Sequence, residues 1–272
     1  MTINLDVVID TPEHSVDMKA GLDSLQGVSD ASRCIAEAIL TERVPEKLHH
    51  KGKVRTTLKQ SFTGSYGHVF SLDIHDAKLL SKFKEIGAPV FAEMIGYFFS
   101  EALYRDSKRL SIKAASIIER LGNIAEELES QLRKSSLNKI HQVSLKFNHD
   151  LKLRYRASRE DQTIIAKFDY STAQVLSAKP TNEVFQIEAN ITRLNINTGN
   201  GRLLVSGEED TVAFGFEYAY REVNLKAKKL FSSNLDFNNG LEDVDRDFLK
   251  LTVTPIRLHD GTIVKYLVRS IP

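Results

Sequence analysis

The chain has 272 residues, enough for one large domain or two ordinary ones. Hydrophobic residues make up 42% of it and charged residues 27%, as is typical of a soluble folded protein. The net charge is +1, with 19 Lys and Arg against 19 Asp and Glu up to Lys139 and 18 against 17 after it. This balance excludes a strongly basic domain that would attract nucleic acid or anionic lipid through its overall field.

Cysteine content and hydropathy bear on the compartment. Cys34 is the only cysteine, so neither an intrachain disulfide nor a thiolate zinc cluster is expected. The first ten residues lack the basic flank and long apolar run of a signal peptide. The most apolar stretch, 88–103, is interrupted by Glu93 and Glu101, and no stretch reaches the roughly 18 apolar residues of a membrane span. We therefore expect a cytoplasmic protein with no membrane segment.

The first third of the chain predicts both strands and a helix. Residues 3–9 alternate apolar and polar at first, as a half-buried strand does. Helical spacing of apolar residues over 16–40 predicts a helix with Ser15 as its N-cap. Residues 54–74 then predict two strands joined by a turn at 62–67.

The middle of the chain is predicted to be helical. Asp76 can cap a helix that Gly87-Ala-Pro89 interrupts, and a second helix runs on through Leu103. From about Ser107 apolar residues recur at i, i+3, i+4 and i+7, which predicts an amphipathic helix. Its apolar stripe favours packing within its own domain, and pairing with another subunit is the alternative. The residues of this predicted oligomer or partner interface are Leu110, Ile117, Leu121, Ile124 and Leu128.

The remainder of the chain is predicted to be mainly β. The segment 145–156 fits both a strand and a helix, and we favour a helix up to about Ser144 with a strand after it. Further strands are predicted over 163–168, 184–196, 201–205, 211–216 and the hairpin 248–271, with a short helix over 225–235. The hairpin turns at Asp260-Gly261, one of the strongest two-residue turn signals. Short strands with one helical insertion suit a small closed barrel.

These elements predict an α+β fold with an N-terminal α/β domain, a helical middle and a small C-terminal β-barrel. The predicted boundary lies within 135–142. The expected domains are therefore 1–140, an α+β domain ending in a helical hairpin, and 141–272, a mainly β domain with the small barrel.

No motif in the sequence predicts a catalytic, cofactor or metal site. The histidines are scattered and match no metal-binding pattern. Cys34 fits a small buried apolar residue. Ser65 is rejected as a nucleophile because its turn joins two strands, whereas a nucleophile elbow joins a strand to a helix. An enzyme assembled from distant residues, such as His68, Asp73 and Glu93, is left open as an alternative.

Two groups of cations suggest a second alternative, nucleic-acid binding by the barrel. Small barrels bind single strands by combining a basic groove with aromatic platforms. One group lies on a predicted strand, and the other follows Tyr218 and Tyr220. The candidate residues are Lys152, Arg154, Arg156, Lys226, Lys228 and Lys229.

Three stretches of the chain resemble a bacterial family of uncharacterised two-domain proteins carried by mobile elements and defence islands. They are Ala20–Gly27, the Gly64-Ser65 turn before a strand, and Ile191–Gly201. The resemblance spans most of the chain and implies an α+β N-terminal domain, a helical middle, a C-terminal barrel and a role beside a partner protein in phage defence. It supplies no catalytic residues. Our leading hypothesis is a non-enzymatic binding or assembly protein that forms a homo-oligomer or docks on a partner protein.

Overall fold

The structure, a computed structural model, describes residues 2–49, 51–62 and 66–271. It divides into two compact units, an N-terminal one over residues 1–176 and a C-terminal one over residues 177–272. The predicted α+β class with a C-terminal barrel is confirmed. Residues 63–65, on which the predicted Gly64-Ser65 turn and the assessment of Ser65 depend, lie outside the described part.

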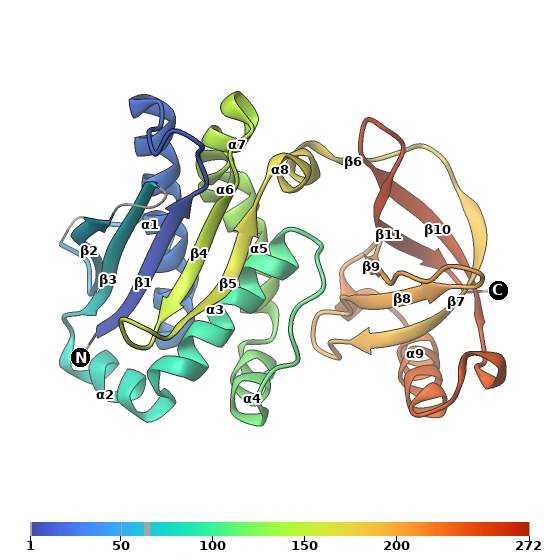
Figure 1. The fold of residues 1–272 in the computed structure, drawn as a ribbon. Helices are drawn as coiled ribbons and strands as arrows, with labels where there is room; N and C mark the ends of the chain where they lie inside the picture. Colours follow the sequence, from blue (N-terminus) through green and yellow to red (C-terminus); the bar gives the residue numbers. More distant parts are fainter. Residues whose placement is uncertain (1, 50, 63–65, 272) are drawn as a thin grey trace. The chain divides into compact units, whose positions relative to one another are not determined.

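The N-terminal unit is built on a five-stranded antiparallel sheet of order β2-β3-β1-β4-β5 (Figure 1). Its strands are β1 (Thr2–Ile9), β2 (Val54–Phe62), β3 (Tyr66–Ile74), β4 (Leu151–Arg156) and β5 (Gln162–Phe168). In the register of the central strands, Val7 lies opposite His68 on one side and Leu153 on the other. The first strand of the chain therefore forms the middle of the sheet, and β5 forms one of its edges.

Helices cover one face of this sheet (Figure 1). The helices of this unit are α1 (Met18–Thr41), α2 (Ala77–Ile86), α3 (Ala88–Ala102), α4 (Ile112–Leu121), α5 (Asn123–Lys134), α6 (Ser136–Ile140), α7 (Gln142–Phe147) and α8 (Tyr170–Ser177), the last of which lies beyond the end of β5. Asp76 caps α2 as predicted, accepting a hydrogen bond of 3.0 Å from Leu79 N. The cap of α1 is Asp17 rather than the predicted Ser15, and the helix begins two residues later than expected.

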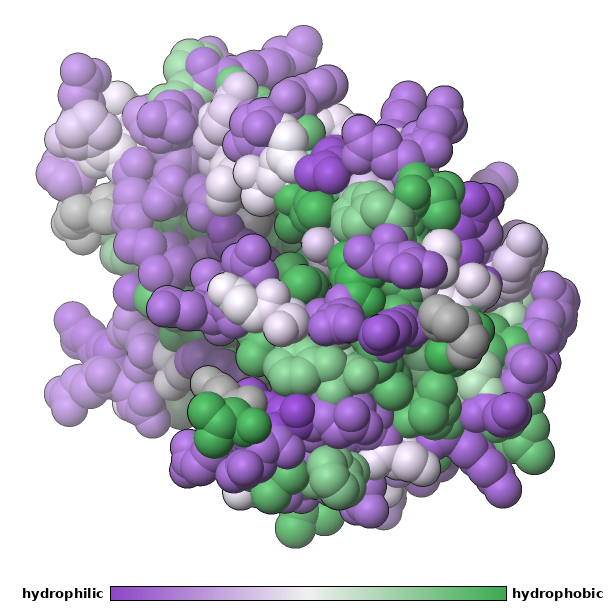
Figure 2. All heavy atoms as spheres, turned by 90° about the vertical axis from the view of Figure 1, so that its right-hand side faces the viewer, coloured by the Kyte–Doolittle hydropathy of each residue, from purple (hydrophilic) through white to green (hydrophobic). Residues whose placement is uncertain are grey.

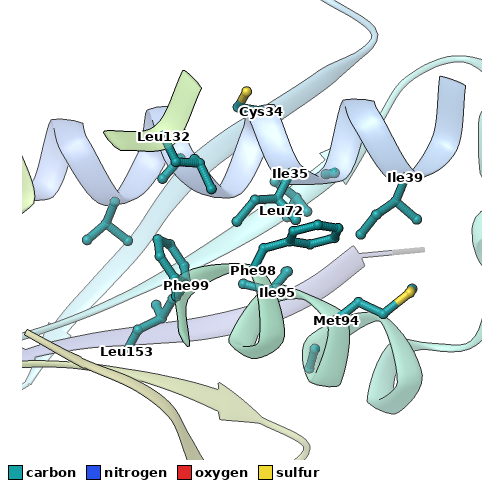
Figure 3. Packing of buried hydrophobic residues seen from close by; sticks show 14 of the residues in the cluster. Cys34, Ile35, Ile39, Leu72, Met94, Ile95, Phe98, Phe99, Leu132 and Leu153 are labelled. Atoms are coloured by element: carbon teal, nitrogen blue, oxygen red, sulfur yellow. The ribbon is translucent and has the colours of Figure 1, made fainter. Parts of the chain in front are cut away.

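A single hydrophobic core lies between the sheet and the helices. Figure 3 shows α1 contributing Cys34, Ile35 and Ile39, and α3 contributing Met94, Ile95, Phe98 and Phe99. Leu72 and Leu153 reach the same core from β3 and β4, and Leu132 reaches it from α5. Elements from both ends of this unit share one apolar interior, so they fold as one body.

The division of the chain lies after Leu176 rather than near residue 140 as predicted. The ambiguous segment forms α7 and then β4, close to the favoured interpretation. However, β4 pairs with β1, and β5 pairs with β4, so both strands complete the N-terminal sheet. The pairing of β1 with β4 joins residues from the two ends of the unit and leaves no local signal in the sequence. The predicted boundary was therefore placed too early in the chain.

The C-terminal unit is a five-stranded barrel. Its strands are β7 (Phe185–Leu194), β8 (Gly201–Val205), β9 (Val212–Phe216), β10 (Leu249–Arg257) and β11 (Ile263–Ser270), with the short β6 (Lys179–Pro180) beside β10. The barrel closes in the order β7-β8-β9-β11-β10-β7, and only the β9–β11 pair is parallel. Helix α9 (Leu225–Asn238) lies between β9 and β10 in sequence, flanked by the 3-10 turns η1 (Tyr220–Glu222) and η2 (Asp243–Asp245). This connectivity is that of an OB fold.

A second, smaller core fills the barrel. Inward residues of the strands, including Leu203, Phe214 and Leu251, are fully buried, and Phe231 of α9 joins them. Outside the core several large apolar side chains remain exposed, among them Tyr218 and Leu225. The surface in Figure 2 accordingly shows hydrophobic areas among hydrophilic ones.

Candidate binding groove beside the edge strand β5

A cavity of about 700 Å³ lies within the N-terminal unit, beside the edge strand β5. Its walls are α3, the segment 103–110 and β5. Five consecutive residues of β5, 163–167, line it. Side chains of a strand point alternately to opposite faces, so a lining by consecutive residues means that the cavity runs along the edge of the strand. Its volume is within the range of about 300–1,000 Å³ that small-ligand sites occupy.

Gly96 sets the distance between α3 and β5. A Cβ atom at this position would lie 2.8 Å from the carbonyl oxygen of Ile165. Because the obstructing atom is backbone, a larger residue would force the helix away from the strand. Glycine in a helix interior is unfavourable by about 1 kcal/mol relative to alanine. The close approach of α3 to β5 therefore comes with a loss of helix stability at this position.

The segment 103–110 is held in place by partly buried polar contacts. The guanidinium of Arg133 donates to the carbonyl oxygens of Ala102 (2.6 Å) and Val175 (3.1 Å). It also lies 4.1 Å from the ring centroid of Tyr104, a residue with a φ of 56°. Burial lowers the pKa of Arg133, and burial raises the pKa of Tyr104. These contacts fix the start of the segment that forms one wall of the groove.

Two carboxylates fix the two ends of the same wall. Glu93 of α3 accepts hydrogen bonds from the backbone N and from the Oγ of Ser111, the latter at 2.7 Å. Asp169 accepts from Arg105 Nη2 at 3.1 Å and from Ser171 Oγ at 2.6 Å. Burial opposes the ionisation of Asp169, but the hydrogen bonds from Ser171, Thr172 N and Arg105 together outweigh it and lower its pKa to about 2. The carboxylate is therefore ionised at neutral pH.

The groove combines an apolar floor with two exposed cations and one exposed acidic residue, Asp106. Phe99 and Leu103 are buried beneath it, and Leu110 is half-buried in its wall. Lys108 and Lys167 are exposed at its rim, and Lys108 Nζ reaches the carbonyl oxygen of Ile164 at 3.4 Å. Such a site offers apolar burial and main-chain groups to a ligand rather than a reactive centre.

The predicted interface stripe is mostly interior. Ile117, Leu121 and Leu128 are buried in the core of the N-terminal unit, and Ile124 packs against that core. The predicted single helix is two helices, α4 and α5, separated by Gly122 with a φ of 53°. Packing within the domain, the favoured interpretation of the stripe, explains these residues. Leu110 alone of the five lines the groove.

The first group of predicted nucleic-acid-binding cations belongs to the N-terminal sheet and not to the barrel. Arg154 Nη2 lies 3.0 Å from Asp6 Oδ2, and Arg156 Nε lies 2.7 Å from Asp6 Oδ1. Lys152 Nζ lies 2.5 Å from Asp10 Oδ2. Asp6 is fully buried, so the two arginines neutralise an interior charge rather than offering two bare cations to phosphate.

The second group lies on the first two turns of α9 in the C-terminal unit. Lys226 and Lys229 are exposed, and Lys228 lies 4.6 Å from the ring centroid of Tyr220. The face of β8 and β9 that binds oligonucleotides in barrels of this topology is elsewhere. There, the outward residues of β9 are Ala213 and Gly215, because Phe214 points into the core. Neither residue offers an aromatic platform.

The residues of the dispersed-enzyme hypothesis have separate partners. His68 and Asp73 lie on β3 at positions of opposite parity, so they point to opposite faces of the sheet. His68 Nδ1 lies 3.0 Å from Ser61 Oγ, and Asp73 accepts from Thr57 Oγ1 at 2.5 Å. Glu93 holds Ser111 in the groove wall. The structure does not join these three residues into one site.

The groove itself was not predicted from the sequence. One local signal was available: a glycine in the middle of the predicted helix 90–103 marks a close approach by another backbone. Which backbone approaches depends on the strand order, which a single sequence does not reveal.

Comparison of the chain with protein-family models, curated proteins and solved structures finds no match. Among the described residues, no helix combines the length and the apolar character needed to cross a membrane.

Proposed function

We propose that the chain is a non-enzymatic binding protein that receives an extended segment of a partner protein as an additional strand along β5. The supporting observation is the groove that runs beside five consecutive residues of this strand. In the described part of the chain β5 pairs with one strand only, β4. An edge strand offers main-chain donors and acceptors to an added strand, and a flanking groove selects its side chains.

The lining of the groove defines the chemistry of this segment. Because side chains of an added strand alternate, every second residue would face the apolar floor at Phe99 and Leu103 and the wall at Leu110. Lys108 and Lys167 at the rim favour a carboxylate in the flanking residues. The expected ligand is therefore an extended segment with apolar residues at alternate positions and an acidic residue beside them.

A second copy of the chain is the competing occupant, because an edge strand can also pair with the same edge of another molecule. The groove favours a segment of a partner protein over a second copy. Its apolar floor can hold side chains of such a segment, whereas pairing of two β5 edges would leave the groove empty. Whether the partner belongs to a phage-defence system, as the family resemblance implies, stays a prediction.

The test begins with selection of short random peptides on the immobilised full chain. Dissociation constants of the selected peptides are then measured by fluorescence anisotropy, and amide hydrogen exchange is followed with and without peptide. We expect the peptides to share alternating apolar residues and to slow exchange over residues 163–167. Leu110→Glu, which puts a charge in the groove wall, should weaken binding about tenfold or more.

Lys146→Glu is the matched control. This residue is exposed on α7 and does not line the groove, so its charge reversal should leave peptide affinity unchanged. Protection that appears outside β5 and α3, or equal affinity of the Leu110→Glu variant, would refute the proposal. So would light scattering that shows a stable dimer broken by Leu110→Glu, because the edge would then be occupied by a second copy.

A further inference from the structure

The C-terminal unit contains a cavity of its own, of about 770 Å³. It lies where the end of β9, the segment 218–224, the start of α9 and the end of β11 meet. Its apolar lining comes from Phe216, Val223, Leu230, Val268 and Ile271.

Large apolar side chains remain accessible around this cavity. Tyr218 is 62% exposed and Leu230 38% exposed, and both line it. Phe216 forms one wall and is held by neighbouring rings, with its centroid 5.4 Å from that of Tyr220 and 5.1 Å from that of Phe231. A firmly packed apolar wall with accessible apolar rims is typical of a site that buries the apolar part of a ligand.

Charge in this unit is unevenly distributed. The unit as a whole has 12 Lys and Arg against 13 Asp and Glu. Residues 218–230, around the cavity, hold four of these cations and one carboxylate, whereas residues 236–247 hold one cation and five carboxylates. The segment that forms much of the cavity wall is therefore locally positive.

Two cations and one carboxylate line the cavity directly. The carboxylate, Glu222, lies 3.8 Å from Arg221 Nε, which balances its charge. Lys226 is exposed on the first turn of α9, while Arg269 donates to Glu217 at 2.8 Å and is thereby neutralised. Three lysines lie near the start of α9 and none of the first-turn residues is acidic. Helix stability favours the opposite arrangement, so it does not explain these lysines.

We propose that this cavity is a binding site for a small amphipathic anion. The apolar body of the ligand lies against Phe216, Leu230 and Ile271, and its anionic head pairs with Lys226. A medium-chain carboxylate has this chemistry. The site is independent of the strand-addition groove, because the two cavities share no residue and lie in different units.

The probes are decanoate and its neutral counterpart decanol, titrated into the full chain below their aggregation concentrations and followed by calorimetry. Decanoate should bind with one-to-one stoichiometry and about tenfold more tightly than decanol, because a charge-assisted contact is added to the same apolar burial. Lys226→Gln should remove that preference and leave decanol binding unchanged. Leu230→Asp, at a partly exposed position, should abolish binding of both probes.

Lys250→Gln is the matched control, since Lys250 is an exposed lysine of the same unit on β10, away from the cavity. Tyr218→Ala provides a second apolar variant at a well-exposed position should Leu230→Asp impair folding, and it should weaken both probes. Equal affinity for decanoate and decanol, no binding of decanoate, or insensitivity to Lys226→Gln would overturn the proposal. Displacement of decanoate by a single-stranded oligonucleotide that also depends on Lys226 would overturn it in favour of a nucleic-acid site.

Discussion

Replacing Asp6 is the sharpest test of the charge cluster on the N-terminal sheet. Its carboxylate is 0% exposed, and its oxygens lie 3.0 Å and 2.7 Å from the guanidinium groups of Arg154 and Arg156. Asp6→Ala removes the only carboxylate paired with both arginines among the described residues and leaves two largely buried cations without a counter-charge. Loss of one partner from a buried ion pair destabilises a protein by about 3–5 kcal/mol.

Urea unfolding followed by far-ultraviolet circular dichroism measures this loss. With a slope of about 2 kcal/mol per molar urea, the midpoint of the N-terminal unit should fall by about 2 M. Asp10→Ala is the matched control, because Asp10 pairs with Lys152 at a site where both side chains are at least 30% exposed. Its loss should change the free energy of unfolding by about 0–1 kcal/mol.

A third variant separates the cost of leaving the arginines unpaired from the net contribution of the ion pairs to stability. Replacing Asp6, Arg154 and Arg156 together with leucine or methionine removes the stranded charges, and should recover most of the stability lost in Asp6→Ala. An Asp6→Ala midpoint equal to that of Asp10→Ala would refute the reasoning. If Asp6→Ala gained salt-dependent affinity for single-stranded DNA, Arg154 and Arg156 would be phosphate ligands that Asp6 masks in the wild type.

Three further predictions concern single residues. Gly201→Ala should destabilise the barrel by about 1–3 kcal/mol in urea unfolding, because a Cβ there would lie 2.1 Å from the carbonyl oxygen of Arg193. An unchanged free energy of unfolding would mean that β7 and β8 can move apart at little cost. The lowered pKa of Asp169, about 2, stabilises the fold above about pH 4, and this stabilisation disappears as the pH falls towards 2. After a discount for solvent screening its size is about 1–2 kcal/mol, so Asp169→Asn should lose it at pH 7 and be less acid-sensitive than the wild type in pH-dependent unfolding. Burial, with contributions from Glu37 and Asp30, raises the pKa of the Cys34 thiol to about 12. A disulfide reagent at pH 8 should therefore label Cys34 only as the N-terminal unit unfolds. Rapid labelling of the folded protein would contradict this packing.

The elements that the sequence predicted well are those with local causes. Asp76 caps its helix through a hydrogen bond three residues away, and Gly261, with a φ of 89°, turns the last hairpin. The alternation over 145–156 indicated a strand with apolar residues on one face and cations on the other, and the strand is present over the second half of this segment, at β4. Each of these features is decided within a few residues of chain, and therefore a single sequence shows it.

What failed had long-range causes. The cations of β4 were correctly placed on one face, but the partner that neutralises two of them, Asp6, is 148 residues from Arg154 in the chain. The position of β1 in the middle of the sheet likewise assigns β4 and β5 to the N-terminal unit and not to the barrel. A charge pattern without its partner suggested a binding surface, although the cluster is part of the interior.

The groove beside β5 also has a long-range cause and therefore could not be predicted from the local sequence, and it is a better candidate binding site than the cations of β4. An edge is a property of the whole sheet, because β5 is an edge only if β1 and β4 take their places first. Asp6, Arg154 and Arg156 already pair with one another, so they are not available to bind a partner. By contrast, β5 pairs with β4 alone among the described strands, and a cavity lies beside it. A binding partner would therefore be expected at β5 rather than at the charge cluster.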